Sequence, residues 1–332
     1  MNPKWFIVFI GKGILDIAFG KEVAALNVHV AGFVMNLNRK SHANRIGVEL
    51  RGGLGNQLFQ LAALEHTVTR ENAYPKIDIS RVSLGQFPRK FEISHELLKL
   101  LFQEEPLIIS KKGFSLFFMK IIWRVESLHP FFKFPFRHYA TDLGLDASLG
   151  NAFRKKMLVG YFQTFYSAQS LEWHKKFKKI GIENIEYDFL LSEMKKSKPT
   201  AMHIRGGDYL IDNSGIGNLD IDYYRESLFE SESVKDLIWI FTDDIEYARQ
   251  IAFDCNIDYK IVDEQRLLTP LETLLLMSHA NKIIISNSTF AWWAAFLSKT
   301  AKIYAPSKWF QKMQDPVKLF PDHWQLTRSI WK

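Results

Sequence analysis

The strongest constraint on the fold is a regular alternation of short apolar runs and amphipathic stretches in the last third of the chain. Apolar runs occupy residues 199–204, 236–241, 259–262, 282–286 and 302–305. Stretches with helical spacing lie between several of them, at 245–253, 270–280 and 290–299. Strands that alternate with helices at this spacing are typical of a parallel, doubly wound sheet. Such a sheet binds ligands at the carboxyl ends of its strands, and the polar motifs of this region fall there.

The chain has 332 residues, which is longer than one hydrophobic core usually organises. We therefore expect two domains, residues 45–198 and 199–332, with the Lys- and Glu-rich stretch 175–198 as the connector. Residues 1–44 differ from both domains. They hold one strand-like run at 5–10 and end in a polar run at 36–44. We interpret them as an N-terminal extension whose structure the pattern does not define, with Met35 as an alternative start.

A glycine-rich loop follows the first clear strand of the N-terminal domain. Residues 45–50 alternate as a strand, residues 51–55 read Arg-Gly-Gly-Leu-Gly, and residues 56–70 carry apolar positions at helical spacing. A glycine loop between a strand and a helix exposes backbone N–H groups at the helix N-terminus. This arrangement suits an anionic ligand.

A second motif lies at the end of the strand 199–204, where His203, Arg205 and Asp208 surround a Gly-Gly turn. An arginine at such a position can clamp a diphosphate with its fixed fork of donors, and it stays cationic at any relevant pH. The alternative is a surface turn held by a structural Arg–Asp pair.

A third motif, Ser-Asn-Ser-Thr at residues 286–289, joins the strand 282–286 to an apolar helix. Ser288 or Thr289 is expected to cap that helix. The hydroxyls and the N–H groups of the first turn also suit phosphate oxygens. We expect Trp292 and Trp293, on the same helix, to lie in the core.

Acidic pairs follow two of the predicted elements. Asp243 and Asp244, after the strand 236–241, suit a metal ion, nucleotide hydroxyls or the cap of the next helix, and these alternatives stay open. Asp220 and Asp222 are interpreted as an N-terminal cap. The ten histidines and the single cysteine show no metal-ligand spacing, so we predict no metal site.

Positive charge is concentrated in the first half of the chain. Residues 1–150 hold 19 Lys and Arg against 13 Asp and Glu, whereas residues 151–332 hold 24 against 23. A basic half suits a sugar diphosphate, an anionic glycan, a membrane surface or nucleic acid. Cys255 is the only cysteine, which favours a reducing compartment. No apolar run reaches the roughly 18 to 20 residues of a membrane span, so we predict a cytoplasmic protein.

Residues 111–139 form a block that is rich in both phenylalanine and cations, with Glu126 as its single acid. One interpretation is a helix and connector whose aromatic side chains pack inward while the cations are solvated. The other is a patch that contacts the acceptor or an anionic membrane, which would make the protein peripheral at the inner membrane surface.

Taken together, these motifs resemble those of the α-1,2-fucosyltransferases of glycosyltransferase family 11. The resemblance rests on Gly-Gly-Leu-Gly-Asn-Gln-Leu-Phe-Gln at 52–60, on His-Ile-Arg-Gly-Gly-Asp-Tyr at 203–209, and on the block 286–297. Blocks at 160–163, 219–224, 241–244 and 305–310, and His-Trp at 323–324, also match in order. The similarity covers about residues 45–331. In the second motif Gly206 replaces an arginine of the family pattern.

The resemblance implies an α/β protein of the GT-B type, with two Rossmann-like, doubly wound domains that face each other across a cleft. It implies inverting transfer of fucose from GDP-fucose to the 2-hydroxyl of a β-galactoside in a cell-surface glycan, with no metal and no other cofactor. A lipid-linked glycan is one form of that acceptor.

The same resemblance assigns roles to individual residues. Arg205 would stabilise the departing GDP, and His203 would contact guanine or ribose. The remaining donor-binding positions would be Gly53, Gly55, Asn56, Asp243, Ser288, Thr289 and Phe290. A carboxylate is the natural general base for the acceptor hydroxyl, and Asp208 is the first candidate, with Glu49 as the second.

Three other functions remain open at this stage. A relative disabled by Gly206 would bind GDP-sugar or glycan without turnover. A related transferase would use another donor, such as GDP-mannose. A nucleic-acid binder that used the aromatic and cationic block is disfavoured because no known nucleic-acid-binding module is present.

Overall fold

The computed structural model describes residues 7–10, 14–17, 44–84, 89–128, 137–139, 157–169, 171–210 and 215–332. The chain divides into two units, residues 1–44 and 45–332. In the first unit, β1 (Ile7–Ile10) and β2 (Ile14–Ile17) pair as an antiparallel hairpin. The strand-like run predicted at 5–10 therefore contains a strand, while β2 was not predicted.

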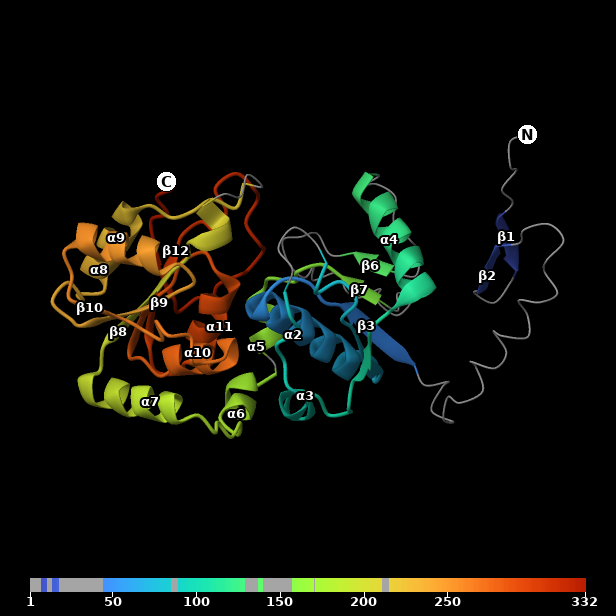
Figure 1. Ribbon diagram of the computed structural model, residues 1–332, viewed down its shortest axis with the longest axis horizontal. Coiled ribbons are helices and arrows are strands. Elements are labelled where there is room, and N and C mark those ends of the chain that lie inside the picture. Colours follow the sequence, from blue (N-terminus) through green and yellow to red (C-terminus); the bar gives the residue numbers. More distant parts are fainter. Residues whose placement is uncertain are drawn as a thin grey trace. The chain divides into compact units, whose positions relative to one another are not determined.

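Within the described residues, the first half of the larger unit contains a five-stranded parallel sheet (Figure 1). Its strand order is β5-β4-β3-β7-β6. The strands are β3 (Arg45–Glu49), β4 (Tyr74–Asp78), β5 (Leu107–Ile109), β6 (Arg137–Tyr139) and β7 (Met157–Val159). The helices of this half are α2 (Leu54–Glu71), α3 (His95–Leu101), α4 (Gly113–Leu128), α5 (Phe165–Gln169) and α6 (Trp173–Phe177).

The second half holds a six-stranded parallel sheet in the order β10-β9-β8-β11-β12-β13, again counted over the described residues. Its strands are β8 (Thr200–Ile204), β9 (Ile238–Thr242), β10 (Tyr259–Ile261), β11 (Lys282–Ile284), β12 (Lys302–Pro306) and β13 (Gln325–Thr327). The helices are α7 (Ile185–Ser197), the short 3-10 helix η2 (Gly207–Leu210), α8 (Ile221–Glu230), α9 (Ile245–Cys255), α10 (Pro270–Met277) and α11 (Thr289–Leu297). The five predicted strands and three predicted helices of this region are confirmed, and β13 was not predicted.

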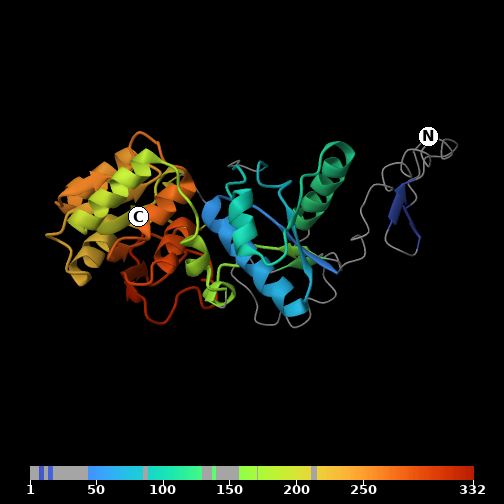
Figure 2. The ribbon, with the colours of Figure 1, turned by 90° about the horizontal axis from the view of Figure 1, so that it is seen from below.

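Successive residues of a strand face opposite sides of a sheet, and the second sheet shows this alternation clearly. Met202, Ile240 and Ile284 face α8 and α9, whereas Ala201, Trp239 and Ile283 face α10 and α11. The helices lie on both faces of the sheet, as Figure 1 shows, and Figure 2 gives the orthogonal view. The predicted α/β class, with two doubly wound Rossmann-like sheets of the GT-B type, is therefore confirmed. The cleft between them stays a prediction.

Helices α2 and α11 join the two halves. Phe59 of α2 packs against the indoles of Trp292 and Trp293, with ring centroids 4.5 and 5.1 Å apart. Both tryptophans are fully buried, as predicted. One continuous apolar core runs through this contact from the first sheet to the second. The amino-terminal ends of the two helices are thereby held against each other.

The block 111–139 differs from its first interpretation. A helix is present as α4, but Phe114 and Phe117 are exposed and do not pack inward, while Trp123 is buried. The predicted inward packing of the aromatic residues is therefore wrong for these two side chains. Phe118 is partly buried on α4, and residues 131–136, with four more phenylalanines, lie outside the described residues.

Candidate functional site

The candidate site lies where the second sheet reverses its strand order. Strands β9 and β10 lie on one side of β8, and β11, β12 and β13 lie on the other. In open α/β sheets, ligands bind beside the carboxyl ends of the two strands at such a switch point. Here those ends carry His203, on β8, and Ser286, just after β11. His203 Nδ1 and Ser286 Oγ are 2.8 Å apart, so one hydrogen bond spans the switch point.

His203 is a buried, neutral side chain. Burial, followed by the nearby charge of Arg205, lowers the pKa of His203 to about 3. Its ring also lies 5.7 Å from the ring of Phe290, centroid to centroid. The imidazole therefore offers hydrogen-bonding and stacking groups at neutral pH, but no positive charge.

Arg205 supplies a positive charge at this edge, and Arg266 adds a second at the end of β9, where its guanidinium donates to Thr242 O and Asp243 O. The guanidinium of Arg205 lies 2.7 Å from Asp243 Oδ2 and stacks on the ring of Tyr209, with Cζ 4.6 Å from the ring centroid. Asp243 comes from the loop after β9, the neighbouring strand. Asp243 and Tyr209 thus orient a largely buried guanidinium, which is the arrangement expected of a preorganised oxyanion clamp.

The turn after β8 is docked on the two acids that follow β9. The amide of Gly206 donates to Asp243 Oδ1 at 3.0 Å, and the amide of Gly207 donates to Asp244 Oδ2 at 3.2 Å. The other oxygen of Asp244 accepts from Tyr247 N at 3.1 Å and caps α9, as one of the alternatives predicted. Both oxygens of Asp243 are engaged within the protein. Its direct contact with the nucleotide stays a prediction.

The third motif places the amino terminus of α11 beside this turn. Ser288 is the N-cap residue, although its side chain makes no capping hydrogen bond. Thr289 and Phe290 open the helix, where N–H groups lack intrahelical partners and the helix dipole favours an anion. Ser288, Thr289 and Phe290 thus lie together at one helix end, as expected.

Gly55 brings the glycine loop of the first half to the same helix end. A Cβ on Gly55 would come within 2.6 Å of Thr289 O and closer still to Phe290 N. Glycine is therefore required by the close approach of the two backbones. The structure assigns Gly55 a packing role, and its predicted contact with the donor stays untested.

Gly53 has no such steric requirement. A Cβ built on Gly53 would meet nothing within 4 Å, and its φ of −78° is open to any residue. The space beside this N-cap residue of α2 is therefore free within the protein. Asn56, one turn further, accepts a hydrogen bond from Gln163 Nε2 at 3.2 Å.

Buried amides that we did not predict as site residues fix the loops. Gln60 accepts from Arg51 N and donates to Gly160 O, both at 3.0 Å, and so ties the ends of β3 and β7 together. Gln57 donates to Gly52 O and Lys90 O. The sequence carries a signal for these contacts, because Gln57 and Gln60 lie three residues apart on an apolar helix face and buried amides need hydrogen-bond partners.

Gln163 links the two halves through a similar contact. It accepts from Trp309 Nε1 at 3.1 Å while its amide nitrogen donates to Asn56. The three side chains therefore form one chain of hydrogen bonds from α2 to the loop after β12. This linkage was also not predicted.

Of the two candidate bases, the structure describes the contacts of Glu49 but not the side chain of Asp208. Glu49 is fully buried, lies 3.0 Å from Arg81 Nη1 and 3.7 Å from Arg51 Nη2, and accepts from Trp123 Nε1 at 3.0 Å. A carboxylate held by two guanidiniums is a poor proton acceptor, so the geometry argues against Glu49 as the base. Asp208 lies in η2, and its side chain is outside the described part of the chain.

Neither a metal-binding cluster nor a membrane-spanning helix occurs within the described ranges. No group of three or more His, Cys, Asp or Glu side chains in those ranges could hold a metal ion. Of the helices that the structure describes, none has the length and apolarity to cross a membrane.

Comparison with known proteins assigns the chain to a family. The family model described as glycosyl transferase family 11 matches residues 21–318, so the chain belongs to this family and to the glycosyltransferases. The match begins at residue 21, inside the segment 1–44, whereas the resemblance in the sequence was placed at about residues 45–331.

Two relatives from Escherichia coli have known assignments. The O-antigen biosynthesis glycosyltransferase WbnK is 26% identical over 307 residues, covering 83% of this chain and 98% of WbnK. An alpha-1,2-colitosyltransferase is 25% identical over 291 residues, covering 83% of this chain and 96% of that protein. Among solved structures, NodZ alpha-1,6-fucosyltransferase soaked with GDP-fucose matches with a TM-score of 0.46 and 12% identity, covering 80% of this chain and 95% of NodZ.

Proposed function

We propose that this chain transfers fucose from GDP-fucose to the 2-hydroxyl of a β-galactoside in a surface glycan, with inversion and without a metal ion. The observation that carries the proposal is the hydrogen bond between His203 and Ser286. It joins the Arg205 turn to the amino terminus of α11 at the switch point of the second sheet. Family membership supports sugar transfer as the class of reaction.

The proposed reaction is a single displacement at the anomeric carbon. The acceptor oxygen forms a bond to C1 of the sugar while the bond from C1 to the β-phosphate oxygen breaks, and the electron pair leaves with GDP. Arg205 and the first N–H groups of α11, at Thr289 and Phe290, stabilise the negative charge that develops on the diphosphate. The acceptor proton passes to a carboxylate, for which Asp208 is the proposed base.

Two features of the relatives guide the choice of substrates. WbnK is named for O-antigen biosynthesis, so we propose a glycan of that kind, carried on a lipid, as the acceptor. The colitosyltransferase favours colitose as a second candidate sugar, because that protein aligns with 83% of this chain. Both candidate donors, GDP-fucose and GDP-colitose, carry the diphosphate that we propose this site binds.

The test is GDP release by the purified protein with GDP-fucose, EDTA and a panel of β-galactoside acceptors, with GDP-colitose and GDP-mannose as alternative donors. We expect acceptor-dependent turnover that EDTA does not change. Arg205→Ala should lower kcat by about 10²- to 10³-fold, the usual effect of removing one oxyanion donor. Arg249→Ala is the matched control, because Arg249 is an exposed arginine that pairs with Glu246 and Glu264 on α9 and the loop after β10.

The outcomes separate the proposed enzyme from a noncatalytic relative. Tight GDP binding with no turnover for any donor and acceptor would favour a binding protein and implicate Gly206. Turnover that is abolished by EDTA would contradict the metal-free mechanism. Equal loss in Arg205→Ala and Arg249→Ala would contradict the role of Arg205.

A further inference from the structure

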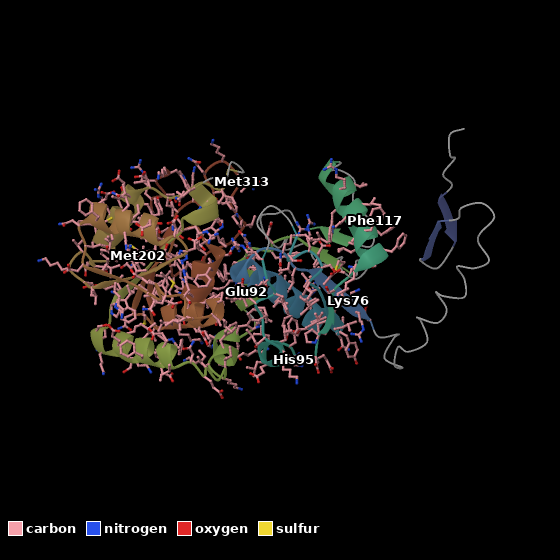
Figure 3. All side chains as sticks on the ribbon, in the orientation of Figure 1. Lys76, Glu92, His95, Phe117, Met202 and Met313 are labelled. Atoms are coloured by element: carbon pink, nitrogen blue, oxygen red, sulfur yellow. The ribbon has the colours of Figure 1, made fainter. Side chains whose placement is uncertain are left out.

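Helix α4 has two apolar sides, and one of them is exposed. Trp123 is buried on the inner side, whereas Phe114, Phe117 and Ile121 are 75%, 59% and 44% exposed. Their spacing of three and four residues places them on one stripe. At 100° per residue, the centre of this stripe lies opposite Trp123. Phe117 is labelled on α4 in Figure 3.

The edge strand that precedes α4 also has exposed apolar residues. Leu107 and Ile108 of β5 are 44% and 37% exposed, and β5 is the edge of the first sheet in the described residues. Since successive strand residues point to opposite sides of a sheet, these two are not grouped with the helix, and we call the set Phe114, Phe117 and Ile121 the α4 face. Exposed apolar residues that are grouped together indicate a surface that contacts a membrane, another protein or a ligand.

The charges within and next to the stripe of the α4 face are positive, although acids lie at both ends of this segment. Residues 106–125 contain Lys111, Lys112, Lys120 and Arg124 and no acid, while Glu104 and Glu105 precede β5 and Glu126 lies two residues beyond Arg124. Lys112, Lys120 and Arg124 are exposed, while Lys111 pairs with Asp78. Phenylalanines flanked by lysines and arginine match the apolar boundary and negative headgroups of an anionic lipid surface. A symmetric contact with a second copy would instead bring these cations together.

The inner side of α4 connects this face to the carboxyl end of the first sheet. Trp123 Nε1 donates to Glu49 Oε2 at 3.0 Å, and Arg81 lies over the indole ring, with Cζ 5.1 Å from its centroid. Glu49 ends β3, immediately before the glycine loop. A helix is about 10 to 12 Å across with its side chains, so the α4 face lies about that distance from this sheet end.

We propose that the α4 face docks on the surface of an anionic lipid bilayer, with the phenylalanines in the headgroup region and the cations against lipid phosphates. Docking in this way would hold the carboxyl end of the first sheet beside the membrane. A lipid-carried acceptor would then enter from the bilayer surface; this last step rests on the proposed function, whereas the docking itself does not.

The experiment is co-sedimentation of the full chain with vesicles of phosphatidylcholine alone and of phosphatidylcholine with 30% phosphatidylglycerol. We expect binding to the anionic vesicles that weakens at 0.5 M salt. Lys112→Gln with Lys120→Gln should weaken it about 25-fold, since each basic residue contributes about fivefold. Phe114→Ser with Phe117→Ser should weaken it at least about tenfold.

Phe229→Ser with Phe253→Ser is the matched control, because these phenylalanines are 78% and 79% exposed on α8 and α9. The proposal is overturned if the wild-type chain ignores anionic vesicles, or if the control pair loses as much binding as the α4 pair. A dimer that Phe114→Ser with Phe117→Ser dissociates, without vesicle binding, would assign the face to a second copy.

Sugar transfer to a soluble acceptor distinguishes the two proposals. The Phe114→Ser, Phe117→Ser variant should keep the wild-type rate with a soluble galactoside and lose rate only with an acceptor embedded in vesicles. Vesicle binding without transfer to any acceptor would uphold docking while contradicting the proposed function. Equal loss of rate with both acceptors would overturn the link between docking and acceptor entry.

Discussion

Replacement of Gly55 by alanine tests the contact between the two halves directly. The added Cβ would lie within 2.6 Å of Thr289 O and closer still to Phe290 N, whereas ordinary carbon contacts are about 3.5 to 4.0 Å. These are backbone atoms, so no side-chain rotation relieves the overlap. One helix terminus has to move by about 1 Å relative to the other.

The expected loss of stability follows from two opposing effects. Overpacking of a tight site usually costs about 1–3 kcal/mol, and a backbone clash belongs at the upper end. Alanine gains up to about 1 kcal/mol over glycine inside a helix, and Gly55 is the second residue of α2. The net expectation for Gly55→Ala is a loss of about 2 kcal/mol in unfolding free energy. At about 2.1 cal/mol/K of unfolding entropy per residue, that loss corresponds to a Tm about 3 °C lower for a protein of 332 residues.

Gly53→Ala is the matched control two residues away. Its Cβ would meet nothing within 4 Å and its φ is −78°, so the only expected cost is that of alanine in place of glycine at an N-cap position, about 0.5–1 kcal/mol. If the donor diphosphate lies against this loop, the methyl group should instead weaken GDP binding. Urea unfolding and calorimetric titration with GDP measure the two effects separately.

The reasoning fails if Gly55→Ala is as stable as the wild-type protein, because the helix termini would then not be in the contact described. It also fails if both variants lose stability equally, since only Gly55 faces backbone atoms. Loss of GDP affinity in Gly53→Ala, with a loss of stability no larger than that of the N-cap change, would support the predicted donor role of the loop.

Three further changes are expected to have measurable effects. Asp243→Asn removes the charge that orients Arg205, so kcat should fall about tenfold with little change in Tm; an unchanged kcat would show that Arg205 needs no such support. The pKa of His203 is about 3 in the folded protein and about 6.5 in the unfolded chain, because burial disfavours the charged imidazole. The free energy of unfolding should therefore fall by about 1.4 kcal/mol for each pH unit below 6.5. His203→Gln should flatten this slope in urea unfolding measured between pH 7 and 5. Burial raises the pKa of Glu65 to about 7, although the charge of Lys176 partly opposes this shift. The stability that the protonated Glu65 contributes is therefore lost as pH rises from 4.5 to 7, and Glu65→Gln should be more stable than the wild-type protein at pH 8 by about 2 kcal/mol. An equal Tm of the two proteins at pH 8 would contradict this.

The second sheet was predictable because its local signals agree. Each strand is a short apolar run, and the following helix has its own start signal, such as Asp244 before α9 or Thr269 with Glu272 as a capping box before α10. β13 was missed because Gln325–Thr327 has two exposed residues out of three and no apolar pattern. Its pairing with β12 is a tertiary effect that local sequence does not encode.

The orientation of α4 was not predictable from its sequence. Apolar residues surround most of this helix, so the pattern alone does not distinguish the side that packs on the protein. The deciding contact is the hydrogen bond from Trp123 to Glu49, which joins residues 74 positions apart. A long-range pairing of this kind becomes visible only in the fold.

The site motifs were located correctly as strand ends, but the roles of their residues depend on neighbours from other motifs. Asp243 was a candidate for nucleotide contact, and the structure engages its oxygens with Arg205 and the Gly206 amide. Gly55 was a candidate for the donor, and it packs on Thr289. In both cases the contacting residue belongs to a different motif, and the sequence alone does not show which motifs lie side by side in the fold.

The same coupling explains why Gly206 is more than a missing arginine. A Cβ at this position would lie 2.6 Å from Asp244 Cβ, and Asp244 in turn holds the Gly207 amide and caps α9. Arginine at position 206 would therefore displace the acid loop instead of adding a second guanidinium to an intact site. We expect Gly206→Arg to lose stability and donor affinity together, whereas Gly206→Arg combined with Asp244→Gly should regain affinity for GDP. Tighter GDP binding in the single variant, measured by calorimetry, would show that the turn and the acid loop are not coupled in this way.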